Sequence, residues 1–143
     1  MKISIEDEAS PADALAVEQG LIAHATAKGI EPRNHRSLAI VLRDDAGAVA
    51  GGLLGATVWG WLHVKELWVA DHCRGQHWGA KLMALAEDEA VARRCHHAFL
   101  DTFDFQALPF YERLGYTVFG SLNDFPKGHV RYFVSKRLDG GVS

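Results

Sequence analysis

The sequence lacks the features that mark several large classes of protein. Only two of its 143 residues are cysteine, Cys73 and Cys95, which is too few for a disulfide framework and fits a reduced environment. No run approaches the roughly 20 apolar residues that span a bilayer, and the first ten residues turn acidic too soon for a signal peptide. The net charge of -3 argues against a dedicated nucleic-acid surface. We therefore expect a cytoplasmic protein that binds neither membranes nor nucleic acid.

Spacings typical of metal sites are also missing. Eight histidines are many for this length, but none forms an HExxH motif and there is no CxxC pair. His72, Cys73 and His77 form only a weak pattern, so we expect no metal. Cys73 has two interpretations, a reactive thiol beside a loop or an ordinary free cysteine, and the second is more common.

The composition that remains is that of a folded protein. Of the residues, 48% are hydrophobic and 23% are charged. A length of 143 residues fits one domain with a substantial core. We expect a single domain over residues 1–143.

Hydrophobic periodicity and turn residues divide the chain into strands and helices. The predicted strands cover residues 1–6, 38–43, 49–57, 62–69, 97–102, 116–122 and 129–137. The predicted helices run from Pro11, after the N-cap Ser10, to the stop signal Gly29, and over residues 80–94 and 107–114. Helices packed on a mixed sheet make an α/β or α+β fold.

Two segments allow more than one interpretation. Residues 30–36 are polar and hold Pro32, which indicates a loop or a short second helix. Gly51 and Gly52 lie inside a predicted strand, where glycine indicates a bulge, a close backbone approach or only local twist.

The strand at residues 62–69 has few polar residues and is expected in the middle of the sheet. Strict alternation predicts which side chains share a face. His63, Lys65, Leu67 and Val69 then share one face, and Leu62, Val64, Glu66 and Trp68 share the other.

A glycine-containing hexapeptide, from Arg74 to Gly79, connects this strand to the helix that follows. Unpaired N–H groups and the positive end of the helix dipole converge at such a junction, which makes it a phosphate-binding device. The alternative is a plain strand-to-helix turn.

Two motifs resemble the GNAT superfamily of acyl-CoA-dependent N-acetyltransferases. The first is Leu67-Trp68-Val69, then four residues, then Arg74 to Gly79, which resembles the superfamily pattern R/Q-x-x-G-x-G/A at a helix start except at its first glycine. The second is residues 110–116, FYERLGY, which is similar to the Y-E-x-x-G-F/Y segment of that fold. The resemblance implies a mixed, largely antiparallel twisted sheet of six to seven strands flanked by helices.

The resemblance also implies that the chain binds acetyl-CoA. The pyrophosphate is expected on the loop amides, and the pantetheine arm is expected to pair with the central strand like an extra strand. The implied cofactor-binding residues are Leu67, Val69, Arg74, Gly75, Gln76, His77, Trp78, Gly79 and Ala80. One residue departs from the superfamily: His77 stands where a glycine is usual, and its side chain either crowds the pyrophosphate or donates to it.

Acetyl transfer needs an acid for the leaving thiolate and a base for the amine. Tyr111 matches the tyrosine that donates to the thiolate in related enzymes, although its ring could also simply pack the short helix. His63 is the first candidate base, with a structural histidine as the alternative. Glu66 is the rival carboxylate, although alternation points it the other way, and His129 is a weaker candidate.

Other polar and aromatic residues are candidates for binding the acceptor. Asp101 and Asp104 either attract a cationic amine or cap the following helix, and Asp104 stands where the superfamily commonly has an asparagine. The aromatic candidates are Trp59, Trp61, Trp68 and Phe105, of which only one or two are expected to touch substrate.

The predicted function is an N-acetyltransferase that passes the acetyl group from acetyl-CoA directly to a primary amine in a ternary complex. The acceptor is a small molecule or a peptide, and a homodimer is possible. The alternatives are a non-catalytic acyl-CoA-binding or regulatory module, and an enzyme for a longer acyl donor.

Overall fold

The computed structural model describes residues 1–138. These residues fall into two compact units, Met1–Arg33 and Asn34–Ser143, the second described as far as residue 138. The expectation of a single domain remains a prediction, and each unit is described by itself.

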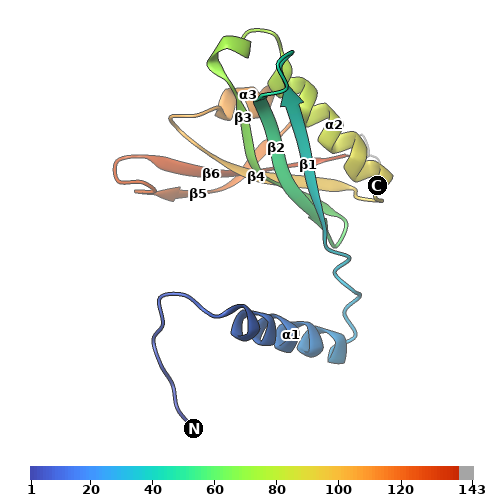
Figure 1. Cartoon of the computed structure of the whole chain (residues 1–143), viewed down its shortest axis with the longest axis vertical. Helices are drawn as coiled ribbons and strands as arrows, with labels where there is room; N and C mark the ends of the chain where they lie inside the picture. Colours follow the sequence, from blue (N-terminus) through green and yellow to red (C-terminus); the bar gives the residue numbers. More distant parts are fainter. Residues whose placement is uncertain (139–143) are drawn as a thin grey trace. The chain divides into compact units, whose positions relative to one another are not determined.

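The first unit consists of helix α1, Pro11–Ala27, and its flanking segments (Figure 1). Ser10 is the N-cap as predicted, since its hydroxyl accepts a hydrogen bond from the Asp13 amide at 3.1 Å. The strand predicted over residues 1–6 is wrong, because these residues are irregular and form no strand. The alternation of two apolar residues does not by itself make a strand. Residues 30–35 are irregular, which supports the loop interpretation.

The second unit is built on one six-stranded sheet with the order β1-β2-β3-β4-β6-β5. Only the pair β3 and β4 is parallel, and the other neighbours are antiparallel. The predicted mixed, largely antiparallel sheet is therefore confirmed, with six strands. The strands are β1 Arg36–Arg43, β2 Val49–Val58, β3 Trp61–Val69, β4 His97–Phe103, β5 Thr117–Asn123 and β6 Val130–Arg137.

Two helices and one short 3-10 turn complete this unit. They are η1 Asp71–Cys73, α2 Trp78–Ala92 and α3 Leu108–Arg113. Helix α2 buries Leu82, Met83, Ala86 and Ala90, which recur at helical spacing. These side chains join Leu53, Leu62, Val64, Leu100 and Val134 of the sheet in the main hydrophobic core.

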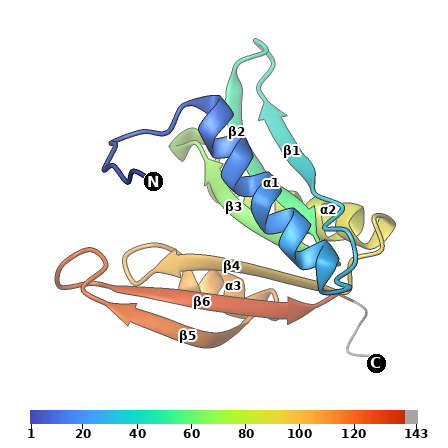
Figure 2. The ribbon, with the colours of Figure 1, turned by 90° about the horizontal axis from the view of Figure 1, so that it is seen from below.

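The two halves of the sheet separate beyond the middle of the unit, as Figure 2 shows. β3 and β4 pair only from Trp61 opposite His97 to Val64 opposite Leu100. The remaining residues of β3 therefore have an edge that β4 does not cover. Edge N–H and C=O groups of this kind are free to pair with another extended chain.

A β-bulge in β3 changes the faces that strict alternation predicts. Leu54 pairs with Glu66 and Gly55 pairs with Val64, so Lys65 is an extra residue on β3. Residues directly opposite each other in an antiparallel pair share a face. Ala56 and Leu54 lie two residues apart on β2, so their partners His63 and Glu66 share a face.

The predicted grouping of side chains on this strand is therefore wrong after Val64. Leu67 and Val69 lie on the core face and pack against the hydrophobic core. Glu66 and Trp68 lie on the face of His63. An extra residue shifts a period of two by one position, which inverts every side chain that follows.

The glycines of β2 mark close backbone approach. A Cβ on Gly51 would lie 2.8 Å from the Trp68 carbonyl oxygen, and one on Gly52 would lie 2.9 Å from that of Ile40. Close approach is therefore confirmed for this pair, and the pairing of β1 with β2 also shifts register beside Gly51, as the bulge interpretation proposed. The bulge in β3 lies opposite Gly55, where a Cβ would overlap the carbonyl oxygen of His63.

Candidate active site

The space between the separated strands opens into a cavity of about 630 Å³. Its walls come from the C-terminal half of β3, the loop before α2, the end of β4 and helix α3. The predicted cofactor-binding residues that line it are Leu67, Val69, Arg74, Gly75, His77, Trp78, Gly79 and Ala80. The structure therefore brings eight of the nine together, and Gln76 does not line the cavity.

The loop before α2 places backbone donors at the cavity wall. Helix α2 begins at Trp78, so the first amides of this helix have no partner within it. Gly75 has a φ of +80°, which favours glycine. A Cβ on Gly79 would meet the Phe110 ring at 3.4 Å, so this glycine lets α2 lie close to α3. Free amides, a helix N-terminus and the open edge of β3 fit a phosphate joined to an amide-bearing arm.

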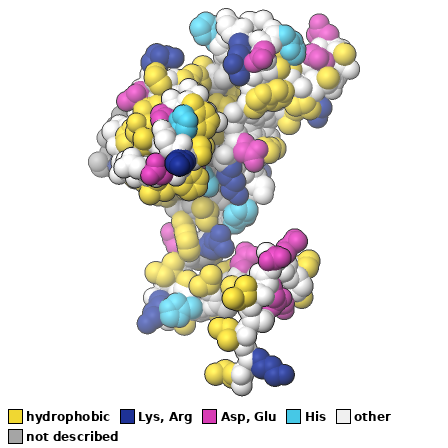
Figure 3. All heavy atoms as spheres, turned by 90° about the vertical axis from the view of Figure 1, so that its left-hand side faces the viewer, with side chains coloured by type: hydrophobic (Ala, Val, Ile, Leu, Met, Phe, Trp, Pro, Cys, Tyr) yellow, Lys and Arg dark blue, Asp and Glu magenta, His cyan; other side chains and the backbone are white. Residues whose placement is uncertain are grey.

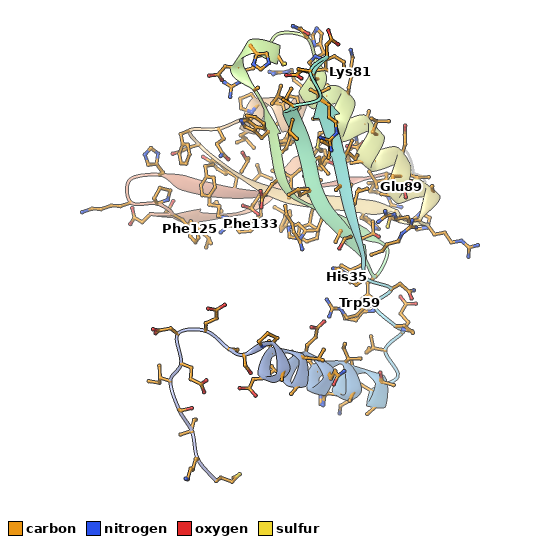
Figure 4. The ribbon with its side chains drawn as sticks, in the orientation of Figure 1. His35, Trp59, Lys81, Glu89, Phe125 and Phe133 are labelled. Atoms are coloured by element: carbon orange, nitrogen blue, oxygen red, sulfur yellow. The ribbon has the colours of Figure 1, made fainter. Side chains whose placement is uncertain are left out.

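The side chains of this loop make their own contacts. The Nε1 of Trp78 donates a hydrogen bond to Gln76 Oε1 at 3.0 Å, and the Lys81 ammonium lies 4.3 Å from the centre of the Trp78 ring. Figure 4 shows Lys81 at the start of α2. Arg74 pairs with Asp71 at 3.2 Å, and both side chains are exposed. The side chain of Gln76 is thus engaged with Trp78, and its part in cofactor binding remains a prediction.

His77 occupies the left-handed region of the backbone, with φ +61° and ψ 22°. This conformation costs a non-glycine residue about 1–2 kcal/mol, whereas the extra chain entropy of glycine costs about 0.5–1 kcal/mol. We expect His77→Gly to raise the free energy of unfolding by about 0.5–1 kcal/mol, measured by urea denaturation. Gly75→Ala is the opposite control, because it places a side chain at a φ of +80°, and it should lower the free energy of unfolding.

The same His77→Gly variant decides between the two roles of the side chain. If the imidazole only crowds the loop, affinity for acetyl-CoA is equal or higher, as measured by calorimetry. A large loss of affinity in a stabilised variant would instead identify His77 as a contact.

Tyr111 projects from α3 into the cavity wall and is 7% exposed. Its ring meets Phe110 and Tyr116 edge-on, with centroids 5.0 Å and 6.1 Å away. Burial raises the pKa of Tyr111 to about 12, and the negative charge of Asp101 adds to this effect. Within residues 1–138, no hydrogen bond holds the Tyr111 hydroxyl. It is therefore protonated at neutral pH and available to donate.

Tyr116 shows what a structural tyrosine looks like in the same unit. Its hydroxyl donates to Glu87 Oε2 at 2.8 Å, and Lys136 Nζ donates to the other Glu87 oxygen at 2.8 Å. Burial raises the pKa of Tyr116 strongly, and Glu87 raises it further. This network ties α2 to β6 and to the start of β5.

His63 pairs with Phe99 of β4, one residue before the pairing of β3 with β4 ends at Val64. Its ring stacks on Phe99 with centroids 4.3 Å apart and 9° between the planes. Burial lowers the pKa of His63, Lys65 lowers it further, and Asp101 opposes them. The imidazole is therefore neutral at pH 7, which suits a base, although the stacking also suits a structural histidine. Neither His63 nor Glu66 lines the cavity.

The lowered pKa of His63 predicts a pH dependence of stability. The unfolded chain takes up the proton before the folded protein does, so stability is full above about pH 6.5 and falls below it. We expect His63→Gln to reduce the loss in melting temperature between pH 7.5 and pH 5. The exposed His35 (Figure 4) offers the control, since His35→Gln should retain the loss. If His63→Gln loses as much melting temperature as the wild-type protein over this range, groups other than His63 control the pH dependence.

Asp101, in β4, and Asp104, just after it, do not cap α3 as one interpretation proposed. The N-cap of α3 is Ala107, and no side chain caps it. Asp101 instead accepts from Arg131 Nε at 2.8 Å, and Asp104 pairs with His129 Nδ1 at 2.9 Å. His129 is therefore held by a carboxylate at the end of the β5–β6 hairpin.

The structure adds residues that the sequence patterns did not indicate. Thr102 and Gln106 line the cavity, with the Thr102 hydroxyl 3.5 Å from Gln106 Oε1. Gln106 supplies a side-chain amide near the position where Asp104 replaces the asparagine of the superfamily. Among the aromatic candidates, Trp68 and Phe105 line the cavity, whereas Trp61 stacks on His97 at 4.4 Å. Only a three-dimensional arrangement shows which polar residues of β4 and its loop face this space.

Metal-ligand clusters and membrane-spanning helices are absent from the described residues. Residues 1–138 contain no group of three or more His, Cys, Asp or Glu side chains arranged to hold a metal ion. No helix among them is long and apolar enough to cross a membrane. Both cysteines are free thiols, and Cys73 lies in the cavity wall.

Comparison with known proteins agrees with this geometry. Residues 6–116 match the acetyltransferase (GNAT) family. The chain is 39% identical over 138 residues to Acetyltransferase Atu2258 of Agrobacterium fabrum, covering 96% of this chain and 100% of that protein. It is 41% identical over 95 residues to a blasticidin-S acetyltransferase of Streptomyces morookaense, covering 66% of this chain and 70% of that protein.

A solved structure extends the similarity to the fold. The crystal structure of an acetyltransferase from Agrobacterium tumefaciens has a TM-score of 0.86 at 38% identity, covering 96% of this chain and 99% of that one. Sequence match, sheet topology and the placement of the cavity all lead to the same assignment. The chain belongs to the GNAT family and is an acetyltransferase.

Proposed function

We propose that this enzyme transfers an acetyl group from acetyl-CoA to a primary amine by direct attack in a ternary complex. One observation carries the proposal. A single cavity joins the donor-rich loop before α2, the open edge of β3 and Tyr111, whose hydroxyl is protonated. The loop and the edge suit the cofactor, and Tyr111 suits the sulfur that leaves.

Different residues of this cavity would bind different parts of the cofactor. The amides at the start of α2 would hold the pyrophosphate, and the open edge of β3 at Leu67 and Val69 would pair with the pantetheine arm. The amide of Gln106 and the hydroxyl of Thr102 are additional polar groups along that path. When bound, acetyl-CoA supplies the thioester carbon that the amine attacks.

Tyr111 acts on the sulfur in this proposal. The new C–N bond forms as the C–S bond breaks, and negative charge collects on sulfur. With its pKa at about 12, Tyr111 is a weaker acid than a thiol, whose pKa is near 8.5. Complete transfer of its proton would cost roughly 5 kcal/mol. Tyr111 therefore serves as a hydrogen-bond donor to the developing thiolate and keeps its own proton. The proton that balances the reaction is the one that the acceptor nitrogen loses.

Two groups are candidates to take the proton from the acceptor nitrogen. The bulge in β3 places His63 and Glu66 on one face, which removes the argument from alternation against Glu66. His63 is neutral and can accept a proton, and Glu66 is exposed to water that could relay one. Replacing each separately and comparing the pH profiles of kcat/KM identifies the base.

The acceptor is proposed to be a small-molecule or peptide amine. One relative is named for acetylation of blasticidin S, an antibiotic, which favours a small molecule. A homodimer and a cytoplasmic location remain proposals. The non-catalytic module is not favoured, because both relatives are named as acetyltransferases.

A thiol-release assay tests the function. Purified protein is incubated with acetyl-CoA and a panel of primary amines, and free CoA is measured against a reaction without amine. Amine-dependent release supports the proposal. Binding of acetyl-CoA in calorimetry without release on any amine would favour the non-catalytic module. Repeating the assay with longer acyl-CoA donors tests how long an acyl chain the cavity accepts.

A further inference from the structure

Phe105 lines the cavity, and its ring belongs to a group of aromatic side chains that we name the aromatic wall: Phe103, Phe105 and Phe125. The rings of Phe103 and Phe105 stack with centroids 5.1 Å apart and 15° between the planes. Phe125 lies 6.2 Å from Phe103, and His129 meets Phe105 edge-on at 5.1 Å. The wall is thus assembled from the end of β4 and the β5–β6 hairpin, segments far apart in the sequence.

The wall is continuous with the proposed site of acetyl transfer. Phe105 lines the same cavity as Tyr111. Its side chain remains 56% exposed, and that of Phe125 remains 44% exposed. Hydrophobic side chains gather on the face that the β5–β6 hairpin presents in Figure 3, and Figure 4 shows Phe125 on this hairpin. Open ring faces next to a reaction cavity are surfaces that a ligand can cover.

The charged groups around the wall are already engaged with one another. Asp101 accepts from Arg131 Nε at 2.8 Å, and the Arg131 guanidinium lies 4.6 Å from the Phe125 ring centre. Asp104 pairs with His129 and also accepts from the Val130 amide at 3.1 Å. A linear polyamine would therefore find Asp101 and Asp104 already paired. Arg131 also lies against Phe103 and Phe125, so what the wall offers to a ligand is above all the exposed ring of Phe105.

Resting on the proposed function, we propose that the acceptor is a primary amine carried by a flat aromatic or heteroaromatic group. The ring stacks on the exposed faces of the aromatic wall, and the amine extends into the cavity toward Tyr111. Aromatic pairs prefer offset-stacked or edge-on arrangements. Contacts with Phe103 and His129 hold the Phe105 ring in place, so that a ligand ring can pack against it in one of these arrangements. Phe105 is thus a residue that determines specificity for the acceptor.

Two pairs of probe amines test this substrate class. The aromatic probes are 2-phenylethylamine and tryptamine, and the linear probes are n-hexylamine and putrescine. We expect the kcat/KM of the wild-type enzyme to be about tenfold higher for the aromatic probes. Equal or higher values for the linear probes would overturn the proposal.

The variant Phe105→Leu removes the ring and keeps an apolar side chain. We expect KM for the aromatic probes to rise about tenfold, while KM for n-hexylamine changes less than twofold. Phe119→Leu is the matched control, because Phe119 is 62% exposed on β5 and lies outside the cavity wall. An equal rise in KM for both classes of amine in Phe105→Leu would contradict a role for the ring.

A binding measurement separates this inference from the proposed function. Calorimetric titration of 2-phenylethylamine and n-hexylamine into the protein with CoA present needs no turnover. If no amine is acetylated, the proposed function fails, and weaker binding of 2-phenylethylamine to Phe105→Leu still supports the aromatic wall. Equal binding of the two amines to the wild-type protein overturns it.

Discussion

Replacement of Tyr111 by phenylalanine is expected to lower kcat by about 10²–10³-fold while affinity for acetyl-CoA stays within about twofold. Tyr111 lines the cavity, and its hydroxyl is protonated because burial raises its pKa to about 12, and it makes no hydrogen bond within residues 1–138. Phenylalanine fills the same space, so the fold and the cavity remain. Steady-state kinetics with acetyl-CoA and an accepted amine, together with calorimetry, give the two values.

Tyr116→Phe is the matched control for that experiment. It removes a buried hydroxyl that donates to Glu87 at 2.8 Å. The expected cost is about 1–2 kcal/mol in the free energy of unfolding, with kcat changed only a fewfold. Should Tyr111→Phe keep its full kcat, Tyr111 would be a packing residue, and the donor to the sulfur would have to be sought elsewhere.

The second large effect is expected from Gly55→Ala. A Cβ at this position would overlap the carbonyl oxygen of His63, a backbone atom that cannot rotate away. We expect a loss of about 3 kcal/mol or more in the free energy of unfolding, measured by urea denaturation. Relief of the overlap requires β2 and β3 to separate at the bulge, so acetyl transfer should fall as well.

Gly120→Ala provides the comparison for this strand variant. Gly120 also lies in a strand, but a Cβ there would meet nothing within 4 Å. Its free energy of unfolding should stay within about 1 kcal/mol of the wild-type value. Similar losses in both variants would mean that strand glycines act through chain entropy and that the close approach at Gly55 is not decisive.

The local elements and the identity of the family could be predicted from the sequence. The helix that begins near Arg74 to Gly79 and the strand that ends at Val69 depend on apolar spacing and on turn residues, which act over a few positions. The boundaries moved by only one or two residues, as with α2, which begins at Trp78. The loop from Arg74 to Gly79, which we propose binds the cofactor, was predicted because its glycines and its place before a helix are local features as well.

Only the tertiary structure decided which side chains meet. The face of Glu66 depends on the bulge at Lys65, and the bulge depends on the pairing of β3 with β2. The segment at residues 1–6 has the alternation of a strand but is irregular. Gln106 and Phe105 reach the site because β3 and β4 stop pairing after Val64 and Leu100. The sequence by itself determined the local elements and the loop proposed to bind the cofactor, because propensity and periodicity are short-range. Register and strand separation arise between segments far apart in the chain, so only the fold determined which side chains share the face of His63 and which form the aromatic wall.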